Sequence, residues 1–225
     1  MIKENEQKNL EKSEENFRQT CYKCFRPKSS CICEFLEPIK TKTIFVILMH
    51  LKEFRKCKNK TGHFTHLNLR NSLLFVGEDF SKHAQVNELI KTHNAYILYP
   101  SKDALNLSKD NLNQNIEQNN TKNNLIFILD GSWPCSRKML KVSKNLASLP
   151  KLSFDFSGVS RFGFKTQPSK ACLCTMESVR EVLKALNDSQ SEKIDKAKLK
   201  NFLNPFLEMV KFQVNYAKQS KVRYK

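Results

Sequence analysis

The chain places several side chains that could do chemistry in one short segment, Asp130-Gly131-Ser132-Trp133-Pro134. The acid follows directly after the apolar run at 125–129, and Trp133 is the only tryptophan among the 225 residues. A carboxylate can accept a proton or hold a cationic group, and an indole can stack on a nucleobase or face a cation. The segment predicts a site in which Asp130, Ser132 and Trp133 act together.

Each of these side chains also has a purely structural interpretation. An acid or a serine at the end of a strand often caps the helix that follows, and a tryptophan at such a junction often fills the core. Pro134 suits the first turn of a helix. One turn further on, Arg137 and Lys138 could contact phosphate or form a solvated helix face. The sequence alone leaves these alternatives open.

A second cluster consists of four cysteines within thirteen residues, in the order Cys21-x2-Cys24-x6-Cys31-x-Cys33. Four thiolates match the tetrahedral preference of zinc, and four protein ligands leave no open position for catalysis. We therefore expect a structural zinc knuckle rather than incidental or disulfide-bonded cysteines. Arg26 and Lys28 would offset the negative charge of the thiolates. The remaining cysteines are scattered and are expected to pack as small hydrophobic side chains: Cys57, Cys135, Cys172 and Cys174.

The charge of the chain favours a polyanionic partner. Lysine and arginine number 39 against 22 acidic residues, which gives a net charge of +17. The excess lies in particular segments, since residues 133–154 hold five basic residues and no acid, and residues 193–225 hold nine basic residues and two acids. This distribution favours an RNA-binding face over general solubility. The hydrophobic fraction of 40%, with 16 phenylalanines, is enough for a core.

The N-terminal residues are polar and contain no apolar stretch of the kind found in signal peptides. The longest apolar run, residues 44–49, is too short to span a bilayer. We therefore expect a cytoplasmic protein with reduced cysteines and no membrane partner. The expected organisation is a disordered or loosely helical leader at 1–19, the zinc knuckle at 20–40, a catalytic α/β domain at 41–218 and a basic tail at 219–225.

The elements that must position these residues alternate between strands and helices. Continuous apolar runs predict buried strands at 43–50, 95–100 and 125–129, with a weaker candidate at 152–156, and residues 62–76 predict a helix that runs into a short strand. One later helix is expected to begin at Thr175 as N-cap, with Glu177 in its first turn, and another at Asn204-Pro205. The Asn-rich segment 107–124 is expected to be an exposed loop.

This alternation indicates an α/β fold with a mainly parallel sheet flanked by helices. Ligands of such sheets bind at the carboxyl ends of the strands, which is where Asp130 falls. His50 also ends a strand, and it is either a site residue or a satisfied core histidine.

The motifs, taken in order along the chain, resemble the DTW-domain family of tRNA-uridine aminocarboxypropyltransferases. The family is named for an Asp-x-Thr/Ser-Trp motif, which is Asp130-Gly131-Ser132-Trp133 here. The resemblance runs from about residue 21 to about residue 216 and includes the cysteine knuckle, His50 and six further blocks: NKTGHFTHL, LYPSKDAL, LDGSWPCSRKML, LASLP, RFGFKTQPS and CLCTMESV.

The resemblance implies a reaction and a fold. The family transfers the 3-amino-3-carboxypropyl group of S-adenosylmethionine (SAM) to N3 of a uridine in tRNA, typically in the variable loop (tRNA position 47). Methylthioadenosine is the leaving product. The family is related to the SPOUT class of RNA-modifying enzymes, so the resemblance implies a SPOUT-like and knotted chain, an exception to the usual rule against threading.

The resemblance also implies roles for particular residues. Asp130 would take the uridine proton or hold the amino group of SAM, and Ser132 and Trp133 would act with it. SAM would contact Gly131, Ser132, Trp133, Gln167 and Thr175, and tRNA would contact Arg137, Lys138, Arg161 and Lys165.

Three positions depart from the family pattern. Leu51 stands where the family usually has proline, Lys60 is an inserted residue, and Cys174 replaces serine. These departures concern contacts with the cofactor or the tRNA and leave the Asp-x-Ser-Trp motif intact.

Two other functions remain compatible with these residues. One is a SAM-dependent RNA methyltransferase of the SPOUT type, and the other is a zinc-bearing RNA-binding protein without catalysis. The pairing of Asp130 with Trp133 at a strand end disfavours the second, because simple binding has no chemical need of both. No feature of the sequence indicates an oligomeric state.

Overall fold

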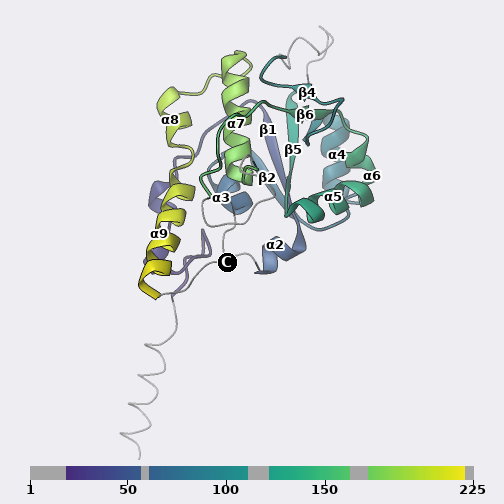
Figure 1. The fold of residues 1–225 in the computed structure, drawn as a ribbon. Helices are drawn as coiled ribbons and strands as arrows, with labels where there is room; N and C mark the ends of the chain where they lie inside the picture. Colours follow the sequence, from purple (N-terminus) through teal and green to yellow (C-terminus); the bar gives the residue numbers. More distant parts are fainter. Residues whose placement is uncertain (1–18, 57–60, 111–121, 163–171, 221–225) are drawn as a thin grey trace, which may run out of the picture.

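The computed structural model describes residues 19–56, 61–110, 122–162 and 172–220. Six parallel strands form one sheet in the order β2-β1-β5-β3-β6-β4 (Figure 1). The strands are β1 (Ile44–Met49), β2 (Ser72–Val76), β3 (Asn94–Leu98), β4 (Leu105–Asn106), β5 (Asn124–Asp130) and β6 (Lys151–Ser153). The expectation of a parallel α/β fold is confirmed.

The adjacent interior strands β1 and β5 are the most hydrophobic ones because both of their faces are covered. In β1 and β5 nearly every side chain is buried, and the two strands pair in register from Ile44 opposite Leu125 to Met49 opposite Asp130. A strand buried on both faces needs a continuous apolar run rather than an alternating one. The strands predicted from the apolar runs are confirmed, with shifts of one or two residues at their ends, and the weak candidate at 152–156 is the shorter β6.

Helices cover both faces of the sheet (Figure 1). On one face, α3 (Thr61–Leu67), α7 (Thr175–Asp188), α8 (Lys196–Asn201) and α9 (Asn204–Ser220) share a core with Phe45 and Ile47. On the other face, α4 (Ala84–Thr92), α5 (Trp133–Val142) and α6 (Lys144–Ala147) pack with Val46 and Leu48. Successive residues of β1 therefore enter opposite cores, as strand geometry requires. The short α2 (Leu51–Lys56) follows β1 directly.

The start of α7 differs by one residue from the sequence-based expectation. The N-cap is Cys174, whose backbone is extended, and Thr175 is already helical. Glu177 explains the shift, because its carboxylate accepts a hydrogen bond from the backbone N–H of Cys174 at 2.9 Å and so closes the first turn around that residue. The helix predicted from Asn204-Pro205 is confirmed, and Phe206 and Met209 on its predicted apolar face are fully buried.

Several predicted segments fall outside the described residues. These are the leader up to residue 18, the end of the tail from residue 221, residues 111–121 of the Asn-rich loop and residues 163–171. Among the residues that are described, no helix has the length and apolar character needed to cross a membrane.

Candidate active site and metal centre

Asp130 is the last residue of β5 and lies at the carboxyl edge of the sheet. Its side chain is largely buried, with 6% of the residue exposed. The hydroxyl of Thr175, the first residue of α7, donates a hydrogen bond to Asp130 Oδ1. The backbone N–H of His50 donates to the Asp130 carbonyl oxygen at 2.9 Å. The carboxylate is thus held between a central strand and a helix that begins 45 residues later.

Gly62, in the first turn of α3, closes over the same carboxylate. A Cβ atom at this position would fall 2.5 Å from Asp130 Cγ, far inside van der Waals contact. Only glycine allows α3 to approach the acid so closely. The sequence analysis did not single out Gly62, although it lies within the NKTGHFTHL block that carries part of the family resemblance.

Replacing Gly62 by Ala is expected to displace the Asp130 carboxylate and to have a smaller effect on folding stability. The added methyl group would push the Asp130 carboxylate away from Thr175, and overpacking of this kind costs about 1–3 kcal/mol of folding stability. We expect any reaction that uses this carboxylate to slow about 100-fold, since a misplacement of about 1 Å near reacting groups has this effect. Single-turnover rates and thermal melts would separate the two effects. A Gly62→Ala protein that is less stable than wild type but equally active would contradict the claim that activity depends on the exact position of the Asp130 carboxylate.

The Asp-Gly-Ser-Trp segment turns directly from β5 into α5. Ser132 occupies the N-cap position of α5, although its side chain makes no capping hydrogen bond, and Trp133 and Pro134 form the first turn. The Ser132 hydroxyl therefore does not cap this helix. Trp133 is 39% exposed, and its indole stands edge-on to Tyr99 at 6.5 Å between ring centroids. Trp133 therefore does not fill the core, because a large part of the residue is exposed.

His50 is a satisfied core histidine at the same edge. Its Nδ1 accepts a hydrogen bond from the backbone N–H of Lys52 at 3.0 Å, so the proton of the neutral ring lies on Nε2. Nε2 lies 3.0 Å from Glu78 Oε1, and Lys138 Nζ lies 2.7 Å from Glu78 Oε2. Glu78 therefore links the end of β1 to α5. Of the predicted RNA contacts, Lys138 forms this ion pair and Arg137 is exposed beside it.

Replacing Glu78 by Gln is expected to remove an acid-sensitive contribution to stability. The hydrogen bond from Lys138 lowers the pKa of Glu78 from its ordinary value of 4.5. Because the folded-state pKa is depressed, this contribution is present above the unfolded-state pKa and is lost as the pH falls through the folded-state pKa. The difference in melting temperature between wild type and Glu78→Gln should therefore be full at neutral pH, shrink as the pH falls below 4.5, and vanish once the pH is below the depressed folded-state pKa of Glu78. A difference that persists unchanged in acid would contradict the assignment.

The remaining predicted contacts lie in the segment between β6 and α7. Arg161 is exposed, whereas Lys165 and Gln167 lie outside the described residues. The carboxylate of Glu177 holds the start of this segment, accepting hydrogen bonds from the Ser160 hydroxyl at 2.8 Å and the Arg161 backbone at 2.7 Å. Glu177 thus positions Arg161 relative to α7. The sequence alone predicts only that Glu177 lies in the first turn of a helix.

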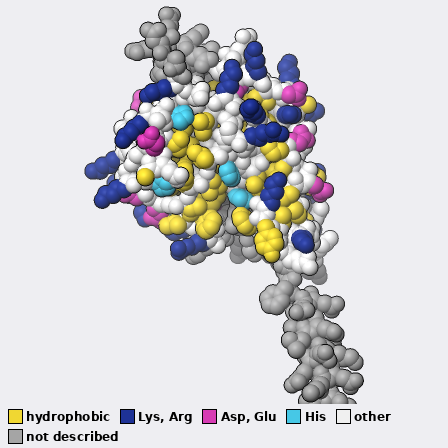
Figure 2. Space-filling view, turned by 180° about the vertical axis from the view of Figure 1, so that it is seen from behind, with side chains coloured by type: hydrophobic (Ala, Val, Ile, Leu, Met, Phe, Trp, Pro, Cys, Tyr) yellow, Lys and Arg dark blue, Asp and Glu magenta, His cyan; other side chains and the backbone are white. Residues whose placement is uncertain are grey.

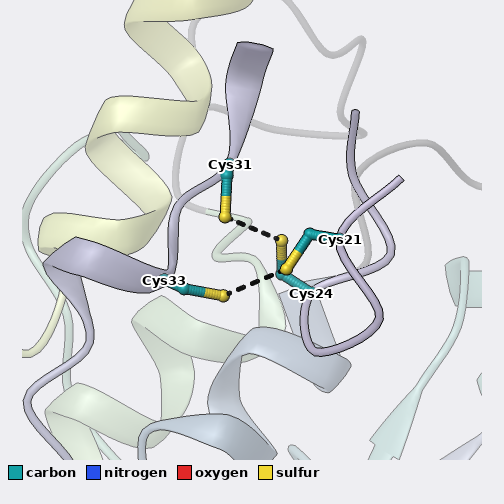
Figure 3. A group of neighbouring side chains, drawn as sticks. All are labelled: Cys21, Cys24, Cys31 and Cys33. Atoms are coloured by element: carbon teal, nitrogen blue, oxygen red, sulfur yellow. Dashed lines mark hydrogen bonds between the residues drawn. The ribbon is translucent and has the colours of Figure 1, made fainter. Parts of the chain in front are cut away.

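The four predicted metal ligands come together as expected from their spacing. The sulfurs of Cys21, Cys24, Cys31 and Cys33 all lie within 4.8 Å of one another and converge on one point (Figure 3). Two of the pairs, Cys21 with Cys33 and Cys24 with Cys31, have sulfurs 3.7 Å apart. Zn–S bonds of about 2.3 Å in a tetrahedron place sulfurs about 3.8 Å apart. The arrangement therefore fits a zinc ion, which would be held by thiolates alone.

The protonation of the four thiols also suits a metal. Hydrogen bonding from the Cys24 backbone lowers the pKa of Cys21 to about 6, whereas burial raises the pKa of Cys31 and Cys33. The raised pKa values of Cys31 and Cys33 favour protonated thiols when no cation is present, and binding of a divalent ion would release these protons. The buried guanidinium of Arg26 lies close enough to interact with Cys24 and Cys31, as predicted, whereas Lys28 points to solvent.

The other cysteines only partly follow the sequence-based expectation. Cys174 is buried, and burial raises its pKa well above the ordinary value. Cys135 and Cys172 are partly exposed, and Cys57 lies outside the described residues.

Comparison with known proteins places the chain in a family. Residues 18–214 match the DTW domain, so the chain belongs to the DTW domain family. It is 28% identical over 178 residues to the tRNA-uridine aminocarboxypropyltransferase 2 of Drosophila melanogaster, covering 76% of this chain and 68% of the relative. Identity to the mouse protein of the same name is 24% over 208 residues, covering 90% and 66%. The chain spans about two thirds of the length of these relatives. No solved structure was found to match it.

Proposed function

We propose that this protein transfers the 3-amino-3-carboxypropyl group of SAM to N3 of a uridine in tRNA and releases methylthioadenosine. One observation carries the proposal: in a chain of the DTW family, the motif acid lies at the carboxyl end of the interior strand β5, and the indole of the same motif reaches solvent. The relatives in fly and mouse are named for this activity. The variable loop of tRNA is the proposed target, and the cytoplasm is the proposed compartment.

The reaction is a displacement at the γ-carbon of the methionine part of SAM. A bond forms between N3 of the uracil and this carbon, the bond from the carbon to sulfur breaks, and its electron pair neutralises the sulfonium. The N3 proton must leave, and Asp130 is the proposed acceptor. Because the sulfonium is already activated, the protein mainly has to position the two substrates. Thr175 and Gly62 fix the carboxylate for this purpose.

The other residues of the edge have proposed roles in binding. Trp133 is proposed to stack on adenine or on the target uracil. The proposed contacts with SAM come from Gly131, Gln167, Thr175 and the hydroxyl of Ser132, which makes no capping hydrogen bond. Arg137, Lys138, Arg161 and Lys165 are proposed to contact the tRNA backbone. The ion pair of Lys138 with Glu78 makes Arg137 better placed than Lys138 to contact a phosphate.

We also propose a SPOUT-like fold and a structural zinc ion in the cysteine cluster. Support for the fold comes from the strand order, since β5 follows β3 in the chain but inserts between β1 and β3. A knot depends on the path between β6 and α7, and residues 163–171 of that path lie outside the described part. The proposed units are the knuckle at 20–40 and the catalytic domain at 41–218.

The by-product of the reaction tests the proposal against its nearest alternative. Purified protein would be incubated with SAM and tRNA transcripts that carry no modifications, and the nucleoside products of SAM would be separated by chromatography. Methylthioadenosine is expected in amounts equal to the modified uridine. S-adenosylhomocysteine would instead indicate an RNA methyltransferase, and tRNA binding without either product would indicate a non-catalytic RNA-binding protein.

A further inference from the structure

Exposed aromatic side chains lie on α9 and on the loop that carries the four clustered cysteines. We call this loop, residues 19–33, the cysteine loop. Six aromatic residues of the described part of the chain are more than one third exposed, and four of them lie on these two elements: Tyr22 at 92%, Phe25 at 51%, Phe212 at 37% and Tyr216 at 52%. A cluster of exposed rings on one part of a surface usually marks a binding site. We call these four residues the aromatic platform.

Phe25 occupies a backbone conformation that does not suit it. Its φ angle is +56°, in the left-handed region that favours glycine or asparagine. The tight turn after Cys24 requires this conformation, because the Phe25 N–H donates to the Cys21 carbonyl at 2.8 Å and the Cys21 N–H donates to the Arg26 carbonyl at 2.7 Å. Glycine would meet the same requirement with less strain. The backbone at this position would therefore suit glycine better than the phenylalanine that the chain carries.

One contact joins the two elements. The guanidinium of Arg26 lies over the ring of Phe212, with its carbon 5.8 Å from the ring centroid. Tyr216 follows Phe212 by four residues and so lies one turn further along the same side of α9. On the other side of the loop, the ring of Phe25 lies 5.0 Å from that of His63 on α3.

Positive charge surrounds the rings. Residues 19–33 and 209–220 contain no acid and carry five cations: Lys23, Arg26, Lys28, Lys211 and Lys218. Lys211 pairs with Glu208 one turn earlier on α9, and Arg26 compensates the thiolates, so Lys23, Lys28 and Lys218 remain to face a partner. Figure 2 shows hydrophobic and cationic side chains side by side on the lower right of the back face, the side on which α9 and the cysteine loop lie.

We propose that the aromatic platform stacks unpaired nucleobases of the tRNA substrate while the neighbouring lysines contact its phosphates. Every base has a face for stacking, and rings interleaved with cations are the pattern of surfaces that bind single-stranded RNA. A second copy of the chain is a poorer occupant, because two such basic surfaces would repel each other. The inference rests on the proposed function only in naming tRNA as the RNA.

The test compares tRNA affinities of matched variants by fluorescence anisotropy. Phe25→Gly relieves the backbone strain, so its zinc content and melting temperature should be maintained while the ring is lost. We expect tRNA binding about tenfold weaker for Phe25→Gly and for Tyr216→Ala, since one stacked base contributes this much or more. Phe25→Tyr and Tyr216→Phe, which keep a ring, should bind as wild type does.

The salt dependence separates stacking from charge. Phe25→Gly and Tyr216→Ala should leave the slope of log Kd against log salt unchanged, whereas Lys218→Ala should reduce it by about one phosphate contact. If Phe25→Gly and Tyr216→Ala both bind tRNA as tightly as wild type does, the inference is wrong, even if the wild-type protein modifies tRNA. A wild-type protein that modifies no tRNA would instead defeat the proposed function, and weakened RNA binding by these variants would still support the platform.

Discussion

Replacing Asp130 by Asn will lower the rate of aminocarboxypropyl transfer by about 10²- to 10⁴-fold, the contribution expected of a positioned proton acceptor. Asparagine has nearly the same size and its carbonyl oxygen can still accept the hydrogen bond from Thr175, so the fold should be maintained. It lacks the negative charge that would take the uracil proton or hold the SAM amino group. The measurement is the single-turnover rate with saturating tRNA and SAM, alongside the affinity for tRNA, which should stay within about twofold of wild type.

Thr175→Val provides the matched control for this prediction. It removes the hydroxyl that holds Asp130 Oδ1 but leaves the carboxylate itself in place. We expect an intermediate rate, because the acid is present but less well oriented. If Asp130→Asn proved as active as wild type, Asp130 would be a structural residue that ties β5 to α7, and the chemistry would have to lie elsewhere along the sheet edge.

Replacing Cys24 by Ser is expected to abolish binding of the proposed zinc ion and to destabilise more than the cysteine loop. Cys24 is fully buried and shares the core that contains Phe206 and Met209 of α9, so loosening the loop also uncovers that helix. Loss of a structural metal site belongs to the substitutions that cost about 4 kcal/mol or more. The zinc content should fall from one ion per chain to none, with a large drop in melting temperature and weakened tRNA binding.

Cys135→Ser is the control for the loss of a thiol as such, since Cys135 lies on α5 and outside the cluster. It should keep one zinc ion and the wild-type melting temperature. Metal analysis and thermal melts of the two variants, measured together, decide the matter. A Cys24→Ser protein that melts like wild type would show that no metal stabilises this loop.

Local patterns predicted the elements and the metal ligands because the relevant physics is local or repetitive. The run at 125–129 had to be a strand buried on both faces, and the four cysteines are so close in sequence that a loop alone can bring them together. The one-residue error at the start of α7 has a local cause as well. The Glu177 carboxylate selects Cys174 as the N-cap, whereas residue preference alone favours Thr175.

The arrangement around Asp130 could not be predicted in this way. Gly62 and Thr175 lie far from Asp130 in the chain, and their contacts with its carboxylate depend on how α3 and α7 pack on the sheet. Side-chain identity likewise did not decide whether Trp133 was buried, because a strand–helix junction can place an indole in the core or at the surface. Only the packing shows that Trp133 is partly exposed.

Digestion of treated tRNA to nucleosides, followed by mass spectrometry, tests the central claim most directly. With wild-type protein and SAM, we predict that one uridine gains the mass of a 3-amino-3-carboxypropyl group, and that Asp130→Asn produces little or none of this nucleoside at equal tRNA occupancy. Unchanged uridine after incubation of the folded, zinc-loaded wild-type protein with unmodified tRNAs, or a gain of a methyl group alone, would contradict it.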